Sequence, residues 1–170
     1  MRSAPTVSWS GVPWLSFVAA FALRLVNPLD GPLGEEPGWR GYALPKLFIT
    51  LSPLAAASVL GLIVTAWHLP LVLMGMLSPF GLPATFAITF VYTWLFNRTG
   101  GSVLLTLIAH ATEGSVNFQG LWAAGPNADR TSWTWLISWA LLVVALLIFD
   151  RKSWRTAPES AIDRVPDRIS

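Results

Sequence analysis

The chain has 170 residues, of which 54% are hydrophobic and only 12% are charged; its formal net charge is +2 and it has no cysteine. Soluble domains usually carry about 25% charged residues, so this composition indicates an integral membrane protein, as does the mean hydropathy of +0.56. The lack of cysteine excludes disulfides and thiolate metal sites, and the small, dispersed positive charge argues against a nucleic-acid partner.

Five apolar segments follow one another along the chain. They cover residues 12–26, 47–77, 82–96, 102–118 and 133–149. Because a membrane-spanning helix needs about 20 mostly apolar residues, we expect an all-α bundle of about five spans, forming one transmembrane domain over residues 1–150. Pro53 and Pro70 are expected to mark the start and a bend of the longest segment, since an interior proline removes a helix hydrogen bond.

Basic residues at the end of the last segment predict the orientation. Arg151, Lys152 and Arg155 follow that segment directly. Because basic residues near span ends favour the cytoplasmic side, we expect a cytoplasmic C-terminus. The charged tail, residues 151–170, is predicted to be disordered. No cleavable signal peptide is evident, so membrane insertion is expected to depend on the spans themselves.

A polar junction over residues 30–46 interrupts the apolar pattern. We expect Pro37 in the first turn of a short helix there, with Glu36 at the cap, where a carboxylate interacts well with the positive helix end. Glu36 and Arg40 are four residues apart and can form an ion pair on one face. Glu35 is then the carboxylate without an obvious local partner. A solvated salt bridge at an interfacial helix start is the structural alternative.

Ionisable side chains at membrane depth are costly and are therefore candidates for function. His68 lies deep in its apolar segment, where a lone histidine is more often a hydrogen-bonded core residue. His110, Glu113 and Asn117 share one helix face, so we expect them to face the bundle interior. An interhelical hydrogen-bond network would serve equally well there. Arg24, near the end of the first segment, is the remaining candidate.

The junction and the two histidines together resemble the motifs of a known family. The run Glu-Glu-Pro-Gly-Trp-Arg-Gly that begins at Glu35 is similar to the first motif of the CPBP intramembrane proteases, also called the CAAX protease and bacteriocin-processing or Abi family. Trp-His-Leu-Pro around His68 resembles the second motif, and the stretch from Arg98 to His110 resembles the approach to the third. The order and spacing of these motifs agree over about residues 25–118.

The resemblance implies an intramembrane endopeptidase, a hydrolase whose site opens toward the cytoplasm. Carried over motif by motif, Glu35 and His68 would activate the water that attacks the scissile carbonyl. His110 would stabilise the oxyanion. Arg40 would hold Glu36.

Two positions depart from the family pattern. Gly114 stands where the third motif has asparagine, four residues after its histidine. Glu113 and Asn117 are candidates to take over that role. Val64 stands where the second motif has an aromatic residue.

A metal ion is an open question in this family, which is described both as a metalloprotease family and as glutamate-based. Glu35, His68 and His110 could form a three-ligand zinc site with an open position. No His-Glu-x-x-His helix is present, so the zincin arrangement is absent from the sequence. We expect no tightly bound metal.

Two other functions stay open from the sequence. Gly114 favours a non-catalytic relative that binds a peptide, such as an immunity or maturation partner. A small bundle could instead relay protons through Glu35, His110 and Glu113. For the protease, the expected partners are the lipid bilayer and a peptide or membrane-protein substrate, such as a prenylated peptide or a bacteriocin leader, in a multi-pass protein of a bacterial inner membrane.

Overall fold

The computed structural model describes residues 14–29, 31–118 and 128–163, without the side chains of residues 117, 118 and 128. All regular elements in these ranges are helical and none is a strand, which confirms the predicted all-α class. In chain order the elements are α1 (Trp14–Val26), α2 (Gly31–Gly38), the π-helical turn η2 (Trp39–Ala43), α3 (Leu44–Phe48), α4 (Pro53–Leu73), α5 (Gly81–Arg98), α6 (Val103–Phe118), α7 (Ala128–Phe149), the 3-10 turn η4 (Arg151–Trp154) and α8 (Glu159–Ile162).

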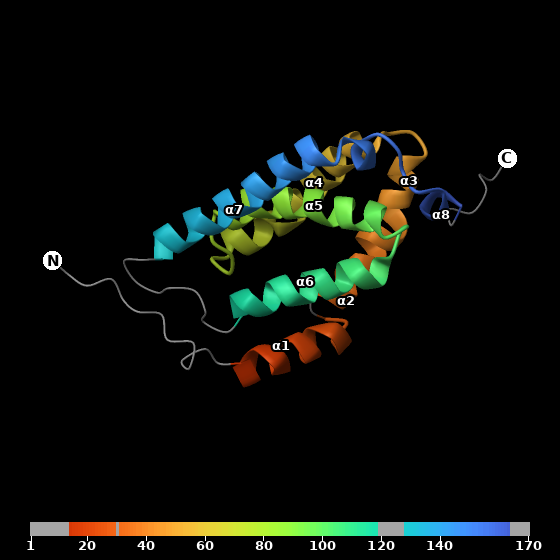
Figure 1. The fold of residues 1–170 in the computed structure, drawn as a ribbon. Coiled ribbons are helices and arrows are strands. Elements are labelled where there is room, and N and C mark those ends of the chain that lie inside the picture. Colours follow the sequence, from red (N-terminus) through yellow and green to blue (C-terminus); the bar gives the residue numbers. More distant parts are fainter. Residues whose placement is uncertain (1–13, 30, 119–127, 164–170) are drawn as a thin grey trace.

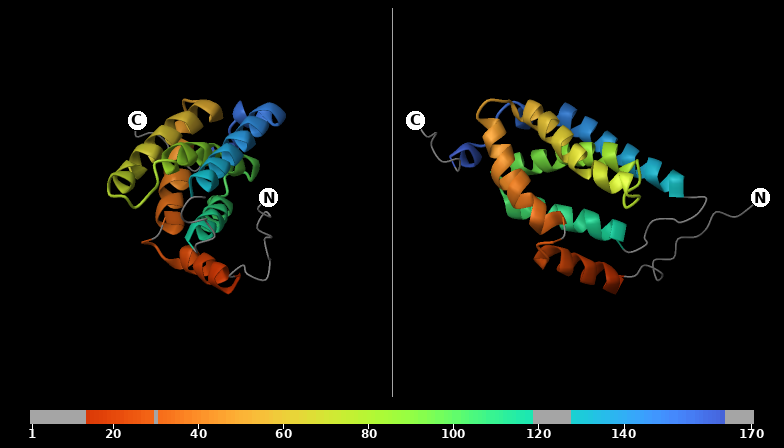
Figure 2. Two further views of the ribbon diagram at one scale, coloured as in Figure 1. Left: turned by 90° about the vertical axis from the view of Figure 1, so that its left-hand side faces the viewer. Right: turned by 180° about the vertical axis from the view of Figure 1, so that it is seen from behind.

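Helix α5 lies at the centre of the bundle. It packs against α4, α7 and α6, while α6 also packs against α1 and α2. The side views accordingly show α6 between α1 and the group formed by α4, α5 and α7 (Figures 1 and 2). The polar junction, in α2 and η2, is therefore held against the helix that carries His110.

Two helices, α4 and α7, are long and apolar enough to cross a membrane. Each candidate span has 21 residues, with mean hydropathies of 1.9 and 2.1. Large apolar side chains point outward from both, among them Leu62 at 64% and Leu141 at 64% exposure. Such a surface is suited to lipid rather than water. The number of five spans stays a prediction.

The polar junction folds differently from the expectation. Helix α2 begins at Gly31, so Pro37 lies inside it and Glu36 is not a cap; the predicted helix start was wrong. The proline removes one helix hydrogen bond, and the chain widens two residues later into the π-helical turn that carries Arg40. Turns of this kind occur frequently at functional sites.

Helix α4 begins at Pro53, as predicted, and continues through Pro70. The Ser52 hydroxyl accepts a hydrogen bond from the Ala55 N–H at 3.4 Å, which caps the helix. Further along, a Cβ at Gly61 would come within 2.9 Å of the Phe86 ring on α5. A small residue here therefore lets the two helices approach closely, as at many membrane-helix interfaces.

The segment predicted to be a disordered tail is folded as far as Asp163. Trp154, in η4, is 4% exposed and packs near Phe90, and Ala161, in α8, is fully buried beside the loop between α5 and α6. The prediction was wrong for residues 151–163 because two apolar side chains anchor an otherwise charged segment. Residues 164–170 lie outside the described part of the chain.

Candidate functional site

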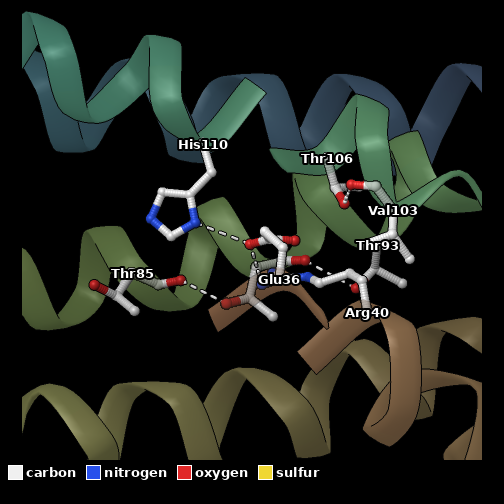
Figure 3. Close-up of polar contacts among 8 residues, drawn as sticks. Glu36, Arg40, Thr85, Thr93, Val103, Thr106 and His110 are labelled. Atoms are coloured by element: carbon white, nitrogen blue, oxygen red, sulfur yellow. Dashed lines mark hydrogen bonds and ion pairs between the residues drawn. The ribbon is translucent and has the colours of Figure 1, made fainter. Parts of the chain in front are cut away.

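A buried ion pair links the polar junction to α6. Glu36 is 0% exposed and Arg40 is 2% exposed. The Arg40 Nη1 donates to Glu36 Oε1 at 2.9 Å, and the His110 Nδ1 lies 2.9 Å from the same oxygen (Figure 3). Since an ionised carboxylate can only accept, this Nδ1 carries a proton and donates it. The predicted Glu36–Arg40 pair is confirmed, and its burial rules out the solvated alternative.

The Glu36 carboxyl is held in its ionised form. Burial raises its pKa, but the Arg40 guanidinium and the hydrogen bond from His110 outweigh burial, and the pKa lies below its ordinary value. An ionised acceptor at Nδ1 fixes both the orientation of the His110 ring and the nitrogen that carries the proton. Glu36 and Arg40 therefore act as a support for His110.

Tyr92, on α5, completes this cluster. Its ring centroid lies 5.1 Å from the Arg40 Cζ and 5.6 Å from the centroid of the His110 ring. Within the described residues, the Tyr92 hydroxyl, Glu36 Oε2 and Arg40 Nε are buried without a hydrogen-bond partner.

Sequence analysis missed Tyr92. A single tyrosine within an apolar segment has no motif spacing, and its only signal was a hydroxyl in a predicted span. The neighbouring hydroxyls of Thr89 and Thr93 donate their protons to carbonyls of their own helix, at 2.9 Å each. Figure 3 shows Thr93 beside the ion pair.

Glu35 and His110 face the same point above Gly31. A Cβ on Gly31 would lie 3.4 Å from Glu35 Oε1 and also 3.4 Å from His110 Nε2. With Nδ1 as the nitrogen that carries the proton, Nε2 is an acceptor whenever the ring is neutral. A carboxylate oxygen and a ring nitrogen that flank one small space can hold a water molecule by its two hydrogens.

His68 stands apart from this cluster. It is half-buried on α4, and its Nδ1 lies 2.8 Å from the Val64 carbonyl oxygen, so Nδ1 is the donor and Nε2 an acceptor. Among the residues that the structure describes, no hydrogen bond joins His68 to Glu35 or to His110. The structure thus brings together Glu35, His110 and the ion pair, and the role of His68 stays a prediction.

Arg24 reaches α6 from the last turn of α1. Its guanidinium lies against Gly114, so closely that a Cβ on that residue would overlap it; the Arg24 Nε would be only 2.6 Å away. The position at which the sequence lacks the family's asparagine is therefore covered by a guanidinium.

Glu113 and Asn117 are the other two residues of α6 that the sequence suggested for the site. Glu113 is half-buried and lies within electrostatic range of the Tyr92 hydroxyl. Asn117 belongs to α6, but its side chain lies outside the described residues. Their predicted supporting roles stay predictions.

The suggested zinc site is not assembled in the described part of the chain. No group of three or more His, Cys, Asp or Glu side chains there lies close enough to hold a metal ion. The hydrogen bond shown for the His68 ring goes to the Val64 carbonyl and not to Glu35 or His110, the other two suggested ligands. The residues present do not fit the three-ligand site, and we derive no step through a metal.

No curated protein and no solved structure matches the chain significantly. A family model described as "Type II CAAX prenyl endopeptidase Rce1-like" matches residues 13–116. That range contains Glu35, Glu36, Arg40, His68 and His110, which are the residues of the three motifs. It also covers more than half of the chain, and the CPBP resemblance is thereby confirmed. The chain belongs to the Rce1-like family of CAAX prenyl endopeptidases, a family of membrane proteases.

Proposed function

We propose that the protein is an intramembrane endopeptidase in which Glu35 activates water. The observation that carries this proposal is the convergence of Glu35 Oε1 and His110 Nε2 on one point above Gly31. A general base must come within hydrogen-bond reach of the proton it removes, directly or through one water. The space above Gly31 meets that requirement for a water bound between the two side chains.

The reaction begins when the water oxygen bonds to the scissile carbonyl carbon. Glu35 takes one water proton, and the carbonyl π electrons move onto the oxygen to form an oxyanion. The oxyanion then collapses, the carbon–nitrogen bond breaks, and the proton on Glu35 passes to the departing amine. Glu35 returns to its starting state, and Glu36 and Arg40 keep the His110 ring in place throughout.

His68 is proposed to assist in water activation. Its Nδ1 proton is engaged with the Val64 carbonyl, so its Nε2 is free of a proton in the neutral ring, as a base requires. The adjacent Trp67 packs edge-on against Trp39, with 6.3 Å between ring centroids, so α4 adjoins the start of η2 at this level. Substrate binding would have to bring His68 and the water together.

The cellular location, the orientation in the membrane and the substrate class are proposed from the family and from the apolar surface. We propose a multi-pass protein of a bacterial inner membrane with its C-terminus in the cytoplasm. The substrate class is a peptide or membrane protein whose scissile bond lies near the cytoplasmic membrane face. Exposed apolar side chains on α4 and α7 support membrane embedding.

Glu35→Gln tests the proposed base. The variant keeps the shape of the side chain but cannot accept the proton, and we expect cleavage to fall about 100-fold or more, within the range for loss of a general base. Cleavage is measured with three internally quenched probes in liposomes: a farnesylated CAAX peptide, a bacteriocin leader peptide and a membrane-helix peptide. The melting temperature should equal that of the parent.

Glu159→Gln, on an exposed carboxylate of α8, is the matched control and should cleave at the parental rate. If the Glu35→Gln variant cleaves as fast as the parent, Glu35 is not the base. A parent that binds the probes and cleaves none of them would support the peptide-binding relative instead.

A further inference from the structure

Arg24 is the one charged residue of helix α1, all of which the structure describes. Its guanidinium reaches α6 in the bundle. Its neighbours Leu23 and Val26 are 55% and 70% exposed, which suits a helix face against lipid. A charged side chain on such a helix is costly unless it turns inward. Arg24 does so, and its guanidinium covers Gly114 of α6.

This contact puts the guanidinium beside the proposed reaction centre. Gly114 follows His110 by four residues, so both lie on one face of α6, roughly 5–6 Å apart at the level of the Cβ positions. The Tyr92 hydroxyl, which lies in the cluster with Arg40 and His110, is also within electrostatic range of Arg24. The Arg24 guanidinium therefore lies over α6 about one helical turn beyond His110.

The proposed reaction needs a donor that His110 in its neutral form does not supply. The His110 Nδ1–H is directed at Glu36, and the Nε2 of the neutral ring accepts hydrogen bonds but cannot donate one. An oxyanion is stabilised by hydrogen-bond donors and by positive charge aimed at it. A guanidinium always carries its proton and has five N–H donors in a rigid fork, so it can bond to several acceptors at once.

We propose that Arg24 is a catalytic residue that donates N–H to the oxyanion, and that position 114 must be glycine to seat its guanidinium. This inference rests on the proposed protease function. As the water oxygen bonds to carbon, the carbonyl electron pair moves onto the oxygen and meets the guanidinium. Arg24 keeps its proton throughout, and the negative charge disappears when the carbon–nitrogen bond breaks.

Arg24→Ala and Arg24→Lys test the role in the full chain, with the probe that the parent cleaves best. We expect kcat to fall about 100- to 1000-fold in Arg24→Ala, the usual loss for one oxyanion donor, with little change in KM. Arg24→Lys keeps the charge but not the fork and should lose less. Arg155→Ala, an exposed arginine that follows η4, is the control and should keep the parental kcat.

The double variant Arg24→Ala/Gly114→Asn distinguishes a catalytic from a purely structural role of Arg24. If Arg24 were only structural, adding the asparagine would not restore kcat. Removing the guanidinium opens the space above position 114, and the asparagine amide can then donate from one turn beyond His110. We expect the double variant to recover at least about tenfold in kcat over Arg24→Ala, since one donor replaces another. Gly114→Asn alone should lower the melting temperature, because its side chain overlaps Arg24.

The outcomes separate this inference from the function on which it rests. A parent that cleaves no probe overturns the proposed function and the role of Arg24 together. If the parent cleaves and Arg24→Ala, folded by its melting temperature, keeps kcat within about threefold, only the role of Arg24 is overturned; a threefold change corresponds to less than 1 kcal/mol.

Discussion

At the scale of single residues, Gly31 leaves open the space that the proposed reaction uses. In Gly31→Ala the new methyl group would lie 3.4 Å from both Glu35 Oε1 and His110 Nε2, where the water is proposed to sit. We expect kcat to fall at least about tenfold, because small displacements of reacting groups have large effects on rate. The melting temperature should not fall, since alanine is a better helix former than glycine.

Gly38→Ala is the matched control for this substitution. It lies in the same helix, and a Cβ there would meet no atom within 4 Å. The control should cleave at the parental rate in the same liposome assay. Equal rates for Gly31→Ala and Gly38→Ala would show that no water is held above Gly31.

The spacing of residues close in sequence predicted one contact of this site, but not the contacts between residues far apart in the chain. The ion pair between Glu36 and Arg40 followed from a separation of four residues, which places both on one helix face. The bond between Glu36 and His110 joins residues 74 positions apart. No local pattern encodes such a contact, and the same holds for Tyr92 and for the approach of Arg24 to α6.

At the scale of elements, the polar junction shows how a proline can mislead. Pro37 predicted a helix start, because its missing N–H is harmless there. The helix instead begins at Gly31, and the turn after the proline widens. As a result Glu35 and Glu36 lie within one helix, where Glu36 reaches His110 Nδ1 and Glu35 faces His110 Nε2.

The C-terminal segment is a second element that composition described poorly. Its charged residues predicted disorder, yet Trp154 is buried near Phe90 and donates its Nε1–H to the Leu146 carbonyl at 3.1 Å. One buried aromatic residue can anchor a segment whose average hydropathy is low. The segment follows α7 and packs against α5, α7 and α4, and we expect it to contribute to the stability of the bundle.

Trp154→Ala measures that contribution. Removing a buried tryptophan leaves a cavity and usually lowers the free energy of unfolding by about 3–5 kcal/mol. The melting temperature in detergent should therefore fall clearly, whereas Trp14→Ala, at a 57% exposed position of α1, should change it little. Equal melting temperatures for the two variants would mean that η4 does not stabilise the bundle.

At the scale of the whole molecule, hydropathy predicted which segments are helices but not which helices are neighbours. The five apolar segments correspond to α1, α4, α5, α6 and α7, with the longest segment divided between α3 and α4. The sides of membrane helices that face lipid and those that face other helices are both apolar, so hydropathy does not identify the packing partners. Small residues carry some of that information, as Gly61 against Phe86 shows.

One polar network joins three elements at the end of α7. The Asp150 carboxylate accepts from the Trp94 indole at 2.8 Å and from the Ser153 hydroxyl at 2.9 Å, and the Arg98 Nε lies 3.4 Å away. The hydrogen bond from Trp94 lowers the Asp150 pKa, partial burial raises it, and the contacts with Ser153 and Arg98 lower it further; the pKa lies below its ordinary value. The ionised carboxylate therefore stabilises the folded protein.

This network predicts how stability depends on pH. A depressed pKa stabilises the folded state fully above the unfolded value of about 3.9, and the contribution is lost as pH falls through the lower, folded value. The melting-temperature difference between the parent and Asp150→Asn should therefore be constant from pH 7 to about pH 5 and shrink below about pH 4. Asp163→Asn, at an exposed position, should show no such change. If the Asp150→Asn difference persists unchanged into acid, the ionised carboxylate does not hold α5, α7 and η4 together. The contacts of Asp150 with Trp94 and Ser153 would then stabilise the fold independently of its charge.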